Sequence, residues 1–308
     1  MSPLRMHLAD YLATRRALGY ELERAEQLLG QFIDYLEQRN EVTITIERAL
    51  EWAALSAGSP GWQAHRLAAV RGFATHLRAI DPACEVPASE LLPGRPQRAV
   101  PYLYSEEQIA ALMGAAQTLR SRHRRTTYRT LIGLLWVTGM RIGEAIGLDR
   151  ADIDWRGALI VVRDTKFGKS RQLPLHESVL AALRRYLRWR DRPRSATETD
   201  AVFVSSAGTR LEMSNVGWTF RRLAARAGIE PRSARCRPRL HDMRHSFAVR
   251  TLADAYRDDG DDVGARLALL CTYLGHVDPR HTYWYLEAAP ELMQLAADRL
   301  ERHLGGTR

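Results

Sequence analysis

The sequence predicts a mainly α-helical protein with one small antiparallel β-sheet, divided into two domains. Apolar residues recur at helical spacing from Leu4 to Leu77, and no strand pattern interrupts them. A proline-rich stretch, residues 87–101, then breaks this pattern. Helical patterns resume after it, and the strand patterns among them are short, the clearest at 158–163. A length of 308 residues also favours two domains over one.

The charge balance favours a polyanionic partner. The chain carries 45 Lys and Arg residues against 36 Asp and Glu, which leaves a net charge of +9. The basic residues are strongly biased to arginine, whose rigid fork of donors matches phosphate oxygens better than the compact ammonium group of lysine does.

The cysteines and the apolar segments indicate an internal, cytoplasmic protein. Cys84, Cys236 and Cys271 lie far apart, without the paired spacing of a disulfide framework or a zinc knuckle. The first residues lack the apolar run of a signal peptide, and the longest apolar stretch, 131–137, is far shorter than the ~20 residues needed to cross a bilayer. We therefore expect no contact with a membrane.

Four helices are expected in a first domain of residues 1–92. The first should end near Gly19, the second carries apolar residues over 28–36, Thr45 should cap the third, and the fourth follows Pro60. This helical unit alone fits a protein-interaction bundle as well as a domain that faces DNA.

The stretch 87–101 is predicted to be an extended, basic linker that carries Arg95 and Arg98. We place the linker proper at 93–101 and a second domain at 102–308.

The second domain should begin with a helix that a capping box defines, with Ser105 as N-cap and Gln108 at the third helical position. The basic cluster 120–125 is expected in a loop that either contacts a DNA backbone or is simply solvated. A strongly apolar helix follows and should break at Gly139. Arg141 comes next, between two packed helices.

Arg141 has two interpretations. It is either an anion-binding residue held by backbone packed on both sides, or a structural arginine that pairs with Glu144 at i+3.

A β-hairpin is expected from strands at 158–163 and 172–175, with Lys166 and Lys169 at its tip. A hairpin tip can reach into a DNA groove, although lysines on an exposed turn are more often only solubilising. A further short strand is expected at 201–204.

Two helices should follow. One spans 178–189, and the other begins at an Asn215 cap and ends at Ala227, with Gly228 just past its end.

The segment 221–239 contains a run of arginines and a single acidic residue, Glu230. Such like charges repel one another unless a partner neutralises them. We interpret this run as the strongest DNA-backbone-binding segment. Its members are Arg221, Arg222, Arg226, Arg232, Arg235, Arg237 and Arg239.

His241, Arg244 and His245 open a helix and share one face of it. Two histidines at i and i+4 could bind zinc, but Asp242 stands where a zinc-protease motif has Glu, and no third ligand is apparent nearby. His241 and Arg244 together make an anion clamp, and His245 is either part of it or a packed histidine.

Near the C-terminus, a Leu-Gly-His276 turn precedes Tyr285 by nine positions, and Tyr283 competes for the same role. Residues 254–263 are expected to form a solvated loop facing away from DNA. An amphipathic helix from Pro290 could pack on its own domain or on a neighbouring protomer.

Together these groups supply what transfer of a phosphodiester requires without a metal. A tyrosine hydroxyl is a better anion than a serine hydroxyl and can form a covalent ester. Two guanidinium forks can hold the non-bridging oxygens, a lysine can protonate the leaving oxygen, and histidines fill the remaining donor and proton-transfer places.

In order and spacing, these motifs resemble the tyrosine recombinase (phage integrase-type) family. The resemblance implies a helical, SAM-like core-binding domain that clamps DNA, followed by a mixed α/β catalytic domain. The motifs that carry it are Thr138-Gly-Met-Arg141-Ile-Gly-Glu144, the hairpin Lys166, His241-x-x-Arg244-His245, Leu-Gly-His276 and the tyrosine nine residues later.

By this resemblance, Arg141 and Arg244 bind the scissile phosphate, and Tyr285 is the nucleophile. Lys166 is the general acid, and His241 and His276 assist. The family's nine-residue offset favours Tyr285 over Tyr283, and the alignment of the 172–175 strand favours Lys166 over Lys169.

The resemblance also implies site-specific DNA recombination through a 3′-phosphotyrosyl bond, with no cofactor and no metal. Integration, excision, transposon movement and the resolution of dimers all fit. The expected partners are double-stranded DNA and accessory recombination proteins, and the expected location is the nucleoid. The protein should act as a homotetramer on two DNA sites, and it can be a monomer in solution. The alternatives are a type IB topoisomerase-like enzyme and a non-catalytic DNA-binding regulator.

Overall fold

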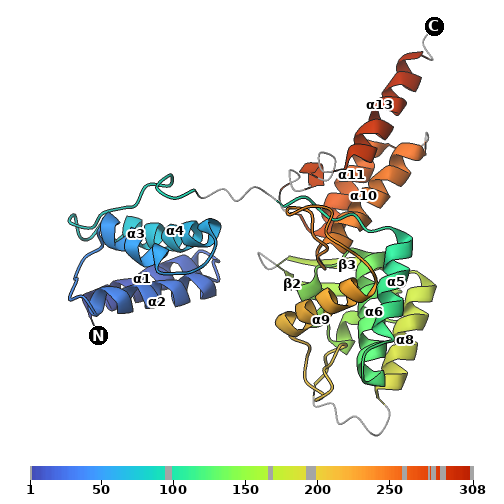
Figure 1. The fold of residues 1–308 in the computed structure, drawn as a ribbon, viewed down its shortest axis with the longest axis horizontal. Coiled ribbons are helices and arrows are strands. Elements are labelled where there is room, and N and C mark those ends of the chain that lie inside the picture. The colour runs from blue at the N-terminus through green and yellow to red at the C-terminus, as the bar shows by residue number, and fades with distance from the viewer. Residues whose placement is uncertain are drawn as a thin grey trace. The chain divides into compact units, whose positions relative to one another are not determined.

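The computed structural model describes residues 2–93, 99–165, 169–191, 199–258, 262–276, 278, 282–284 and 289–305. The chain divides into two units, Met1–Arg98 and Ala99–Arg308. Helices dominate both units, and a three-stranded antiparallel sheet lies in the second (Figure 1). The predicted fold class is confirmed.

The first unit contains the four predicted helices. Apolar side chains from all four form one core, which includes the fully buried Phe32 and Phe73. Thr45 caps the third helix as predicted, and the first helix ends two residues before Gly19. The helices are α1 (Pro3–Ala17), α2 (Glu23–Glu37), α3 (Ile46–Ala54) and α4 (Pro60–Leu77).

The second unit begins with α5 (Glu106–Ala116), α6 (Arg122–Thr138) and α7 (Ile142–Gly147). The predicted capping box is present, because Ser105 and Gln108 each accept a hydrogen bond from the backbone of the other. Gly139 ends α6 in the left-handed conformation, with φ of +60°.

The loop expected at 120–125 is partly wrong, because residues 122–125 form the first turn of α6. The Ser121 hydroxyl accepts a hydrogen bond from the Arg124 backbone and so caps the helix. Two of the arginines in this turn are tied to the protein: Arg125 donates to the Leu119 carbonyl and Arg124 to the Thr219 hydroxyl.

The sheet has the order β1-β2-β3 and contains β1 (Ile153–Asp154), β2 (Leu159–Thr165) and β3 (Lys169–Pro174). A short 3-10 helix, Arg150–Asp152, precedes it. Ile160 pairs with Ile153 on one side and with Leu173 on the other, and all three side chains are buried. The predicted hairpin is therefore confirmed.

The strand expected at 201–204 is wrong. Within the described range 199–258, these residues make only isolated bridges, Asp149 to Ala201 and Val204 to Arg210. They are apolar because they lie in the core, where Phe203 stacks on Tyr186, and not because they pair along an edge.

The remaining helices are α8 (Glu177–Arg190), α9 (Met213–Arg226), α10 (Asp242–Arg257), α11 (Val263–Leu274) and α13 (Pro290–Gly305). The Asn215 cap is wrong: α9 begins earlier, Glu212 is its N-cap, and the Asn215 amide donates to the Glu212 carboxylate. Gly228 follows α9 with φ of +68°, as predicted.

The loop expected from 254 begins later, because α10 continues to Arg257. Residues 259–261 of the expected loop lie outside the described part of the chain. No helix within the described ranges is long and apolar enough to span a membrane.

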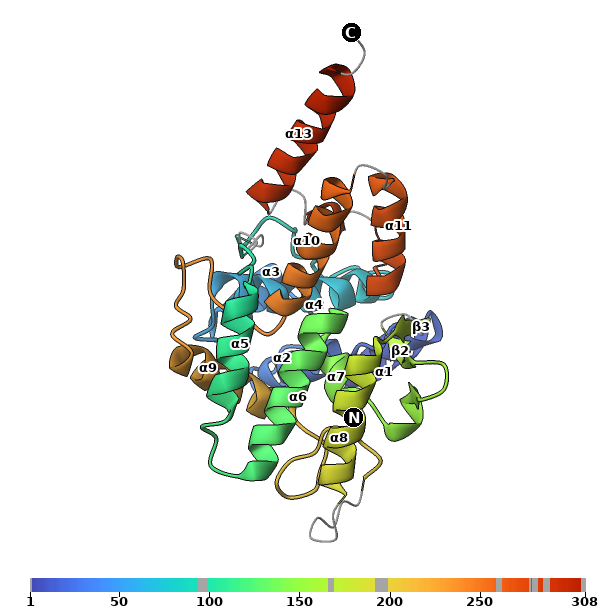
Figure 2. The same cartoon turned by 90° about the vertical axis from the view of Figure 1, so that its right-hand side faces the viewer.

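A small second core joins α10, α11 and α13. Its fully buried members include Leu252, Leu274 and Leu292, so the first turn of α13 packs on its own unit. Figures 1 and 2 show α13 continuing beyond the other two helices, where Leu300 is exposed.

Replacing Gly139 by alanine should destabilise the second unit. An added Cβ atom would lie 2.6 Å from the Phe247 ring. The left-handed backbone would cost about a further 1–2 kcal/mol. The matched control is Gly133→Ala inside the same helix, where the new Cβ would meet Met113 at an ordinary 3.6 Å. Urea unfolding should give a lower midpoint for Gly139→Ala and an equal or higher one for Gly133→Ala; equal loss in both would contradict this account.

Candidate active site

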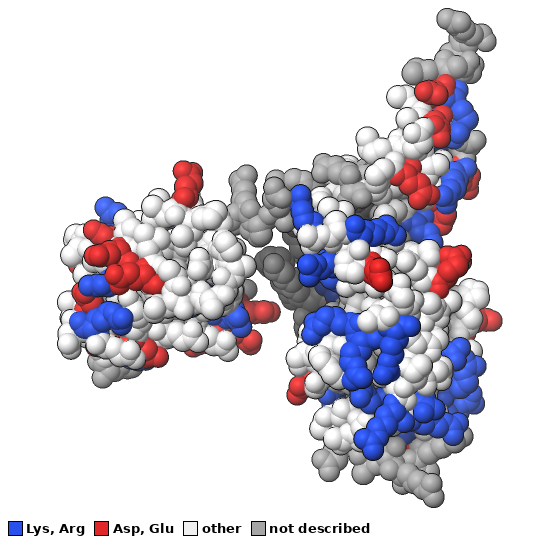
Figure 3. Space-filling model, viewed as in Figure 1, with Lys and Arg blue, Asp and Glu red and all other residues white. Residues whose placement is uncertain are grey.

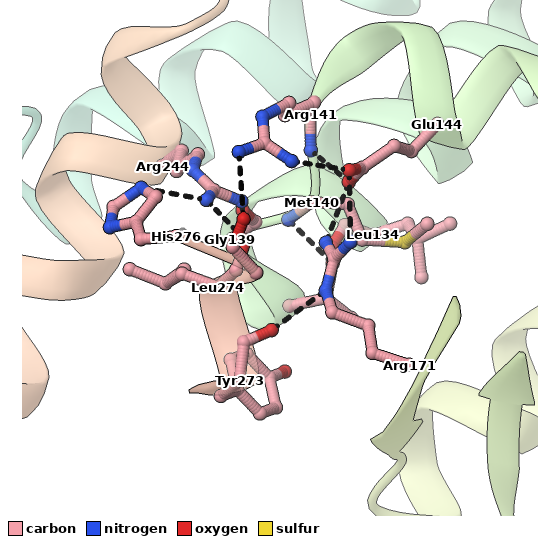
Figure 4. Close-up of polar contacts among 12 residues, drawn as sticks. Leu134, Gly139, Met140, Arg141, Glu144, Arg171, Arg244, Tyr273, Leu274 and His276 are labelled. Atoms are coloured by element: carbon pink, nitrogen blue, oxygen red, sulfur yellow. Dashed lines mark hydrogen bonds and ion pairs between the residues drawn. The ribbon is translucent and has the colours of Figure 1, made fainter. Parts of the chain in front are cut away.

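Arg244 is the most buried charged side chain of the site, with an exposed fraction of 1%. Its Nη1 atom donates to the Gly139 carbonyl at 3.1 Å, and its Nη2 atom donates to the Leu274 carbonyl at 2.5 Å and to His276 Nε2 at 3.0 Å. The two carbonyls belong to the C-terminal ends of α6 and α11, where helix carbonyls lack helical partners and carry partial negative charge. These contacts fix the orientation of the guanidinium (Figure 4).

Arg141 approaches the same place from another element. It is the N-cap residue of α7, and its Nη2 atom donates to the Gly275 carbonyl at 3.4 Å. Gly275 directly follows Leu274, so both guanidinium groups meet at the last turn of α11 (Figure 4). The Arg141 side chain is 34% exposed, so an anion from solvent can reach this end of the site.

Glu144 orients Arg141. The Arg141 Nη1 atom donates to Glu144 Oε1 at 2.8 Å, and the Arg141 backbone N–H donates to Oε2 at 2.9 Å. The ion pair expected under the structural interpretation of Arg141 is therefore present. It coexists with the approach of Arg141 to α11.

Arg171 was missed by the sequence analysis. It extends from β3 and binds both Glu144 oxygens, at 3.0 and 2.7 Å, while its Nε atom donates to the Tyr273 carbonyl at 2.8 Å. The signal was available in the strand alternation, because position 171 lies on the same side of β3 as the buried Leu173. An arginine facing inward on a strand needs a carboxylate partner.

The carboxylate of Glu144 stays ionised between these two arginines. Burial alone would raise its pKa, but the hydrogen bonds and charges of Arg171 and Arg141 outweigh burial and lower the pKa to about 2. One negative charge therefore holds two guanidinium groups in place across the physiological pH range.

His241 is held neutral. His241 keeps an exposed surface, but desolvation by the surrounding protein, followed by the nearby charges of Arg244 and Arg141, lowers its pKa to about 4. His245 packs edge-to-face against His241, with the ring centroids 4.7 Å apart, and against Trp284 at 5.1 Å. These contacts agree with the interpretation of His245 as a packed histidine. In the described part of the chain, no three His, Cys, Asp or Glu residues are grouped to hold a metal ion.

His276 joins Arg244 to the segment that precedes Tyr285. Its Nδ1 atom lies 2.7 Å from the hydroxyl of Thr282, which is fully buried. The Cys271 thiol donates to the same hydroxyl at 3.0 Å. Thr282 is a second residue of the site that the sequence analysis did not single out.

The structure brings together four of the predicted catalytic residues: Arg141, His241, Arg244 and His276. Lys166 and Tyr285 lie outside the described residues, as do Arg95, Arg98 and the side chain of Lys169. Tyr283, the competitor of Tyr285, is 51% exposed.

Three members of the arginine run, Arg239, Arg232 and Arg226, donate side-chain hydrogen bonds to the protein. Arg239 binds the buried Asp242 through two hydrogen bonds, at 3.0 and 2.8 Å, and Arg232 donates to the Leu103 carbonyl. Arg226 donates to the Thr118 hydroxyl. The side chains of Arg221, Arg222, Arg235 and Arg237 are exposed.

Basic side chains gather on one face of the second unit, where α5 and α9 lie (Figure 3). A hollow on this unit is lined by Arg120, Arg124, Arg222 and Arg226. Acidic side chains are sparse on this part of the face (Figure 3). The face therefore presents positive charge to a polyanion.

Comparisons with known proteins agree with this geometry. A model of the phage integrase family matches residues 103–291 of the chain. The chain is 43% identical to the putative integrase/recombinase y4rB of Sinorhizobium fredii, over 98% of each sequence. It is 33% identical to the tyrosine recombinase XerD of Mycobacterium tuberculosis, over 76% of this chain and 70% of that protein.

The chain belongs to the phage integrase family of tyrosine recombinases, the enzymes that break and rejoin DNA strands. The resemblance inferred from the sequence motifs is confirmed.

Solved structures share the fold. The XerH site-specific recombinase bound to difH substrate matches with a TM-score of 0.64 and 20% identity, over 89% of this chain and 78% of that one. The integrase of transposon Tn1549, in complex with transposon right end DNA, matches with a TM-score of 0.63 and 20% identity, over 96% and 98%.

Arg171→Met should destabilise the second unit by about 3–5 kcal/mol, because it leaves the buried Glu144 carboxylate with one of its two cationic partners removed. The matched control is Arg163→Met on the neighbouring strand, since Arg163 pairs with Asp152 and its side chain is 56% exposed. That change should cost less than about 1 kcal/mol. Chemical unfolding of both variants measures the difference, and an equal loss would show that Arg171 is an ordinary surface residue.

Proposed function

We propose that this enzyme performs site-specific recombination of double-stranded DNA, with Tyr285 forming the 3′-phosphotyrosyl bond. One observation carries the proposal: the guanidinium groups of Arg141 and Arg244 meet at the last turn of α11, each held by neighbouring backbone carbonyls. Two such forks can bind the non-bridging oxygens of one phosphate, where negative charge gathers in the transition state.

Cleavage transfers a phosphodiester from the 5′-oxygen of DNA to a tyrosine. The Tyr285 oxygen attacks phosphorus, the bond to the 5′-oxygen breaks, and the phenol loses its proton. Lys166 protonates the departing 5′-oxygen as a general acid. His241 assists as a neutral imidazole, the form that can accept a proton.

Rejoining reverses this step. The 5′-hydroxyl of a second duplex attacks the phosphotyrosine, which restores a DNA phosphodiester and the free phenol. Because the protein–DNA ester retains the bond energy of the original diester, the exchange proceeds without ATP and the proposed residues act without a metal.

Both units bind DNA. Residues 1–92 form the core-binding domain, 93–101 the linker and 102–308 the catalytic domain. The basic face over α5 and α9 supports contact of the second unit with the DNA backbone, through exposed arginines such as Arg221 and Arg222 (Figure 3).

Exchange between two sites needs four active sites, so the working assembly is a tetramer on two duplexes, with accessory proteins where the site requires them. The complexes of XerH and of the Tn1549 integrase with DNA support DNA as the partner. The likeness to a transposon integrase makes transposon movement one of the tasks that fit, beside integration, excision and the resolution of dimers.

Tyr285→Phe should abolish the covalent adduct with DNA, because phenylalanine has no hydroxyl to attack phosphorus. The substrate is a nicked suicide duplex that carries the DNA flanking the gene, and the adduct is detected by denaturing gel electrophoresis and mapped by peptide mass. Tyr283→Phe is the matched control and should keep the adduct. An adduct with Tyr285→Phe, or its loss with Tyr283→Phe alone, would contradict the assignment.

DNA binding should raise the pKa of His241. The bound phosphate offsets the positive charges of Arg141 and Arg244, so the pKa should move from about 4 towards the ordinary value of 6.5. The complex then takes up a proton over that range, and binding tightens as the pH falls through it. NMR titration of the His241 ring in the Tyr285→Phe protein, with and without an intact duplex, measures this; an unchanged or lower midpoint with DNA would place the phosphate elsewhere.

A further inference from the structure

We propose that a groove between α6 and α8 binds an acidic, amphipathic helix of a partner protein. The groove has a volume of about 850 Å³, and α5 forms part of its wall. It gives an accessory protein a place to bind, a role that rests on the proposed function, whereas the binding itself does not require strand exchange.

Each of the two main walls is one stripe of a helix. On α6, the residues that line the groove recur at helical spacing from Arg122 to Val137, and on α8 they run from Ser178 to Trp189. The α6 stripe is about 22 Å long, which is roughly four helical turns. The groove is therefore long enough to hold a helical segment of a partner.

Part of the lining is apolar and open to solvent. Leu134 is buried, but Val137 keeps 40% of its surface exposed. Gly133 on α6 and Ala182 on α8 leave room between the helices, and a Cβ atom added at Gly133 would come near only the end of the Met113 side chain, at 3.6 Å. Apolar surface in such a groove favours contact with the apolar face of an amphipathic helix.

The charges of the groove are all positive. Four arginines are among the described residues that line it, and no acidic residue is. All four are exposed, and within the described ranges none of them forms an ion pair with a carboxylate. Like charges in one groove repel unless a partner neutralises them, so the partner should be acidic. The four are Arg122, Arg129, Arg185 and Arg188.

The place of the groove favours a protein over DNA. Both views of the fold place α5 and α6 between α8 and α9, and α9 carries the exposed arginines that we assign to the DNA backbone (Figures 1 and 2). Contacts to a DNA backbone come from polar and charged groups, whereas a groove with an apolar lining suits a helix with one apolar face.

The test selects helix-forming peptides of roughly 16 residues from a display library on the immobilised whole chain. The enriched peptides should carry a net negative charge and apolar residues at i, i+3, i+4 and i+7. Their affinity, measured by fluorescence anisotropy, should weaken as salt is added, because salt screens the arginines at the edge of the groove.

Two pairs of charge reversals locate the binding. Arg129→Glu combined with Arg185→Glu should weaken binding of the selected peptides by at least about tenfold, because two attractive charges become repulsive. Arg156→Glu combined with Arg184→Glu changes the net charge equally at exposed positions outside the groove. This control pair should weaken binding by less than about twofold.

A change of shape tests the apolar part. Ala182→Leu places a larger side chain in the groove and should weaken binding without changing the charge. Ala181→Leu, at the neighbouring exposed position of α8 outside the groove, should leave binding unchanged. Circular dichroism checks that each variant is folded, and the charge reversals at exposed positions still decide the matter if Ala182→Leu is not.

Four results with the peptides would overturn the proposal. They are no enriched peptide, enrichment of peptides without net negative charge, equal loss of binding in both charge pairs, and full binding by folded Ala182→Leu.

Binding to a duplex that carries the DNA flanking the gene separates a protein partner from DNA. Arg129→Glu with Arg185→Glu should weaken duplex binding no more than Arg156→Glu with Arg184→Glu does. A larger loss would show that the groove is a DNA contact and would also overturn the proposal. A wild-type protein that binds the selected peptides but forms no covalent adduct with DNA would refute the proposed function and leave the groove assignment standing.

Discussion

The site depends on one buried cation, the guanidinium of Arg244, which joins the C-terminal ends of α6 and α11 through the carbonyls of Gly139 and Leu274. Both helices end in a glycine with positive φ, Gly139 at +60° and Gly275 at +67°. That backbone turns the last carbonyls towards the arginine, and an L-residue with a side chain rarely adopts it. The ends of α6 and α11 thus present their carbonyls at the positions where the Arg244 guanidinium can bind them.

The cations of the site are held by a carboxylate as much as by backbone. Glu144 binds Arg141 and Arg171 together, and Arg171 also donates to the Tyr273 carbonyl, next to the turn that receives Arg244 and Arg141. A phosphate-binding site needs guanidinium groups that do not rearrange when the anion arrives. The ion pair between Arg141 and Glu144 therefore serves both interpretations of Arg141: it stabilises the fold, and it holds the guanidinium in place for a phosphate.

The parts of the fold that local chemistry determines were predictable. Thr45 and Ser105 cap helices, Gly139 ends one, and the hairpin of β2 and β3 follows from its alternating pattern. The errors arose where tertiary contacts compete with local signals, as at 201–204, where burial explains the apolar run. Thr282 could not be found from spacing, because its role depends on a hydrogen bond to His276 that only the folded chain brings about.

The most direct test of the account is a structure of the enzyme bound to a duplex nicked at the cleavage site, with orthovanadate in place of the scissile phosphate. The account predicts vanadium bonded to the Tyr285 oxygen, with its non-bridging oxygens in hydrogen-bond contact with Arg141 and Arg244 beside the last turn of α11. Vanadate bound to a different side chain, or out of reach of either arginine, would contradict it.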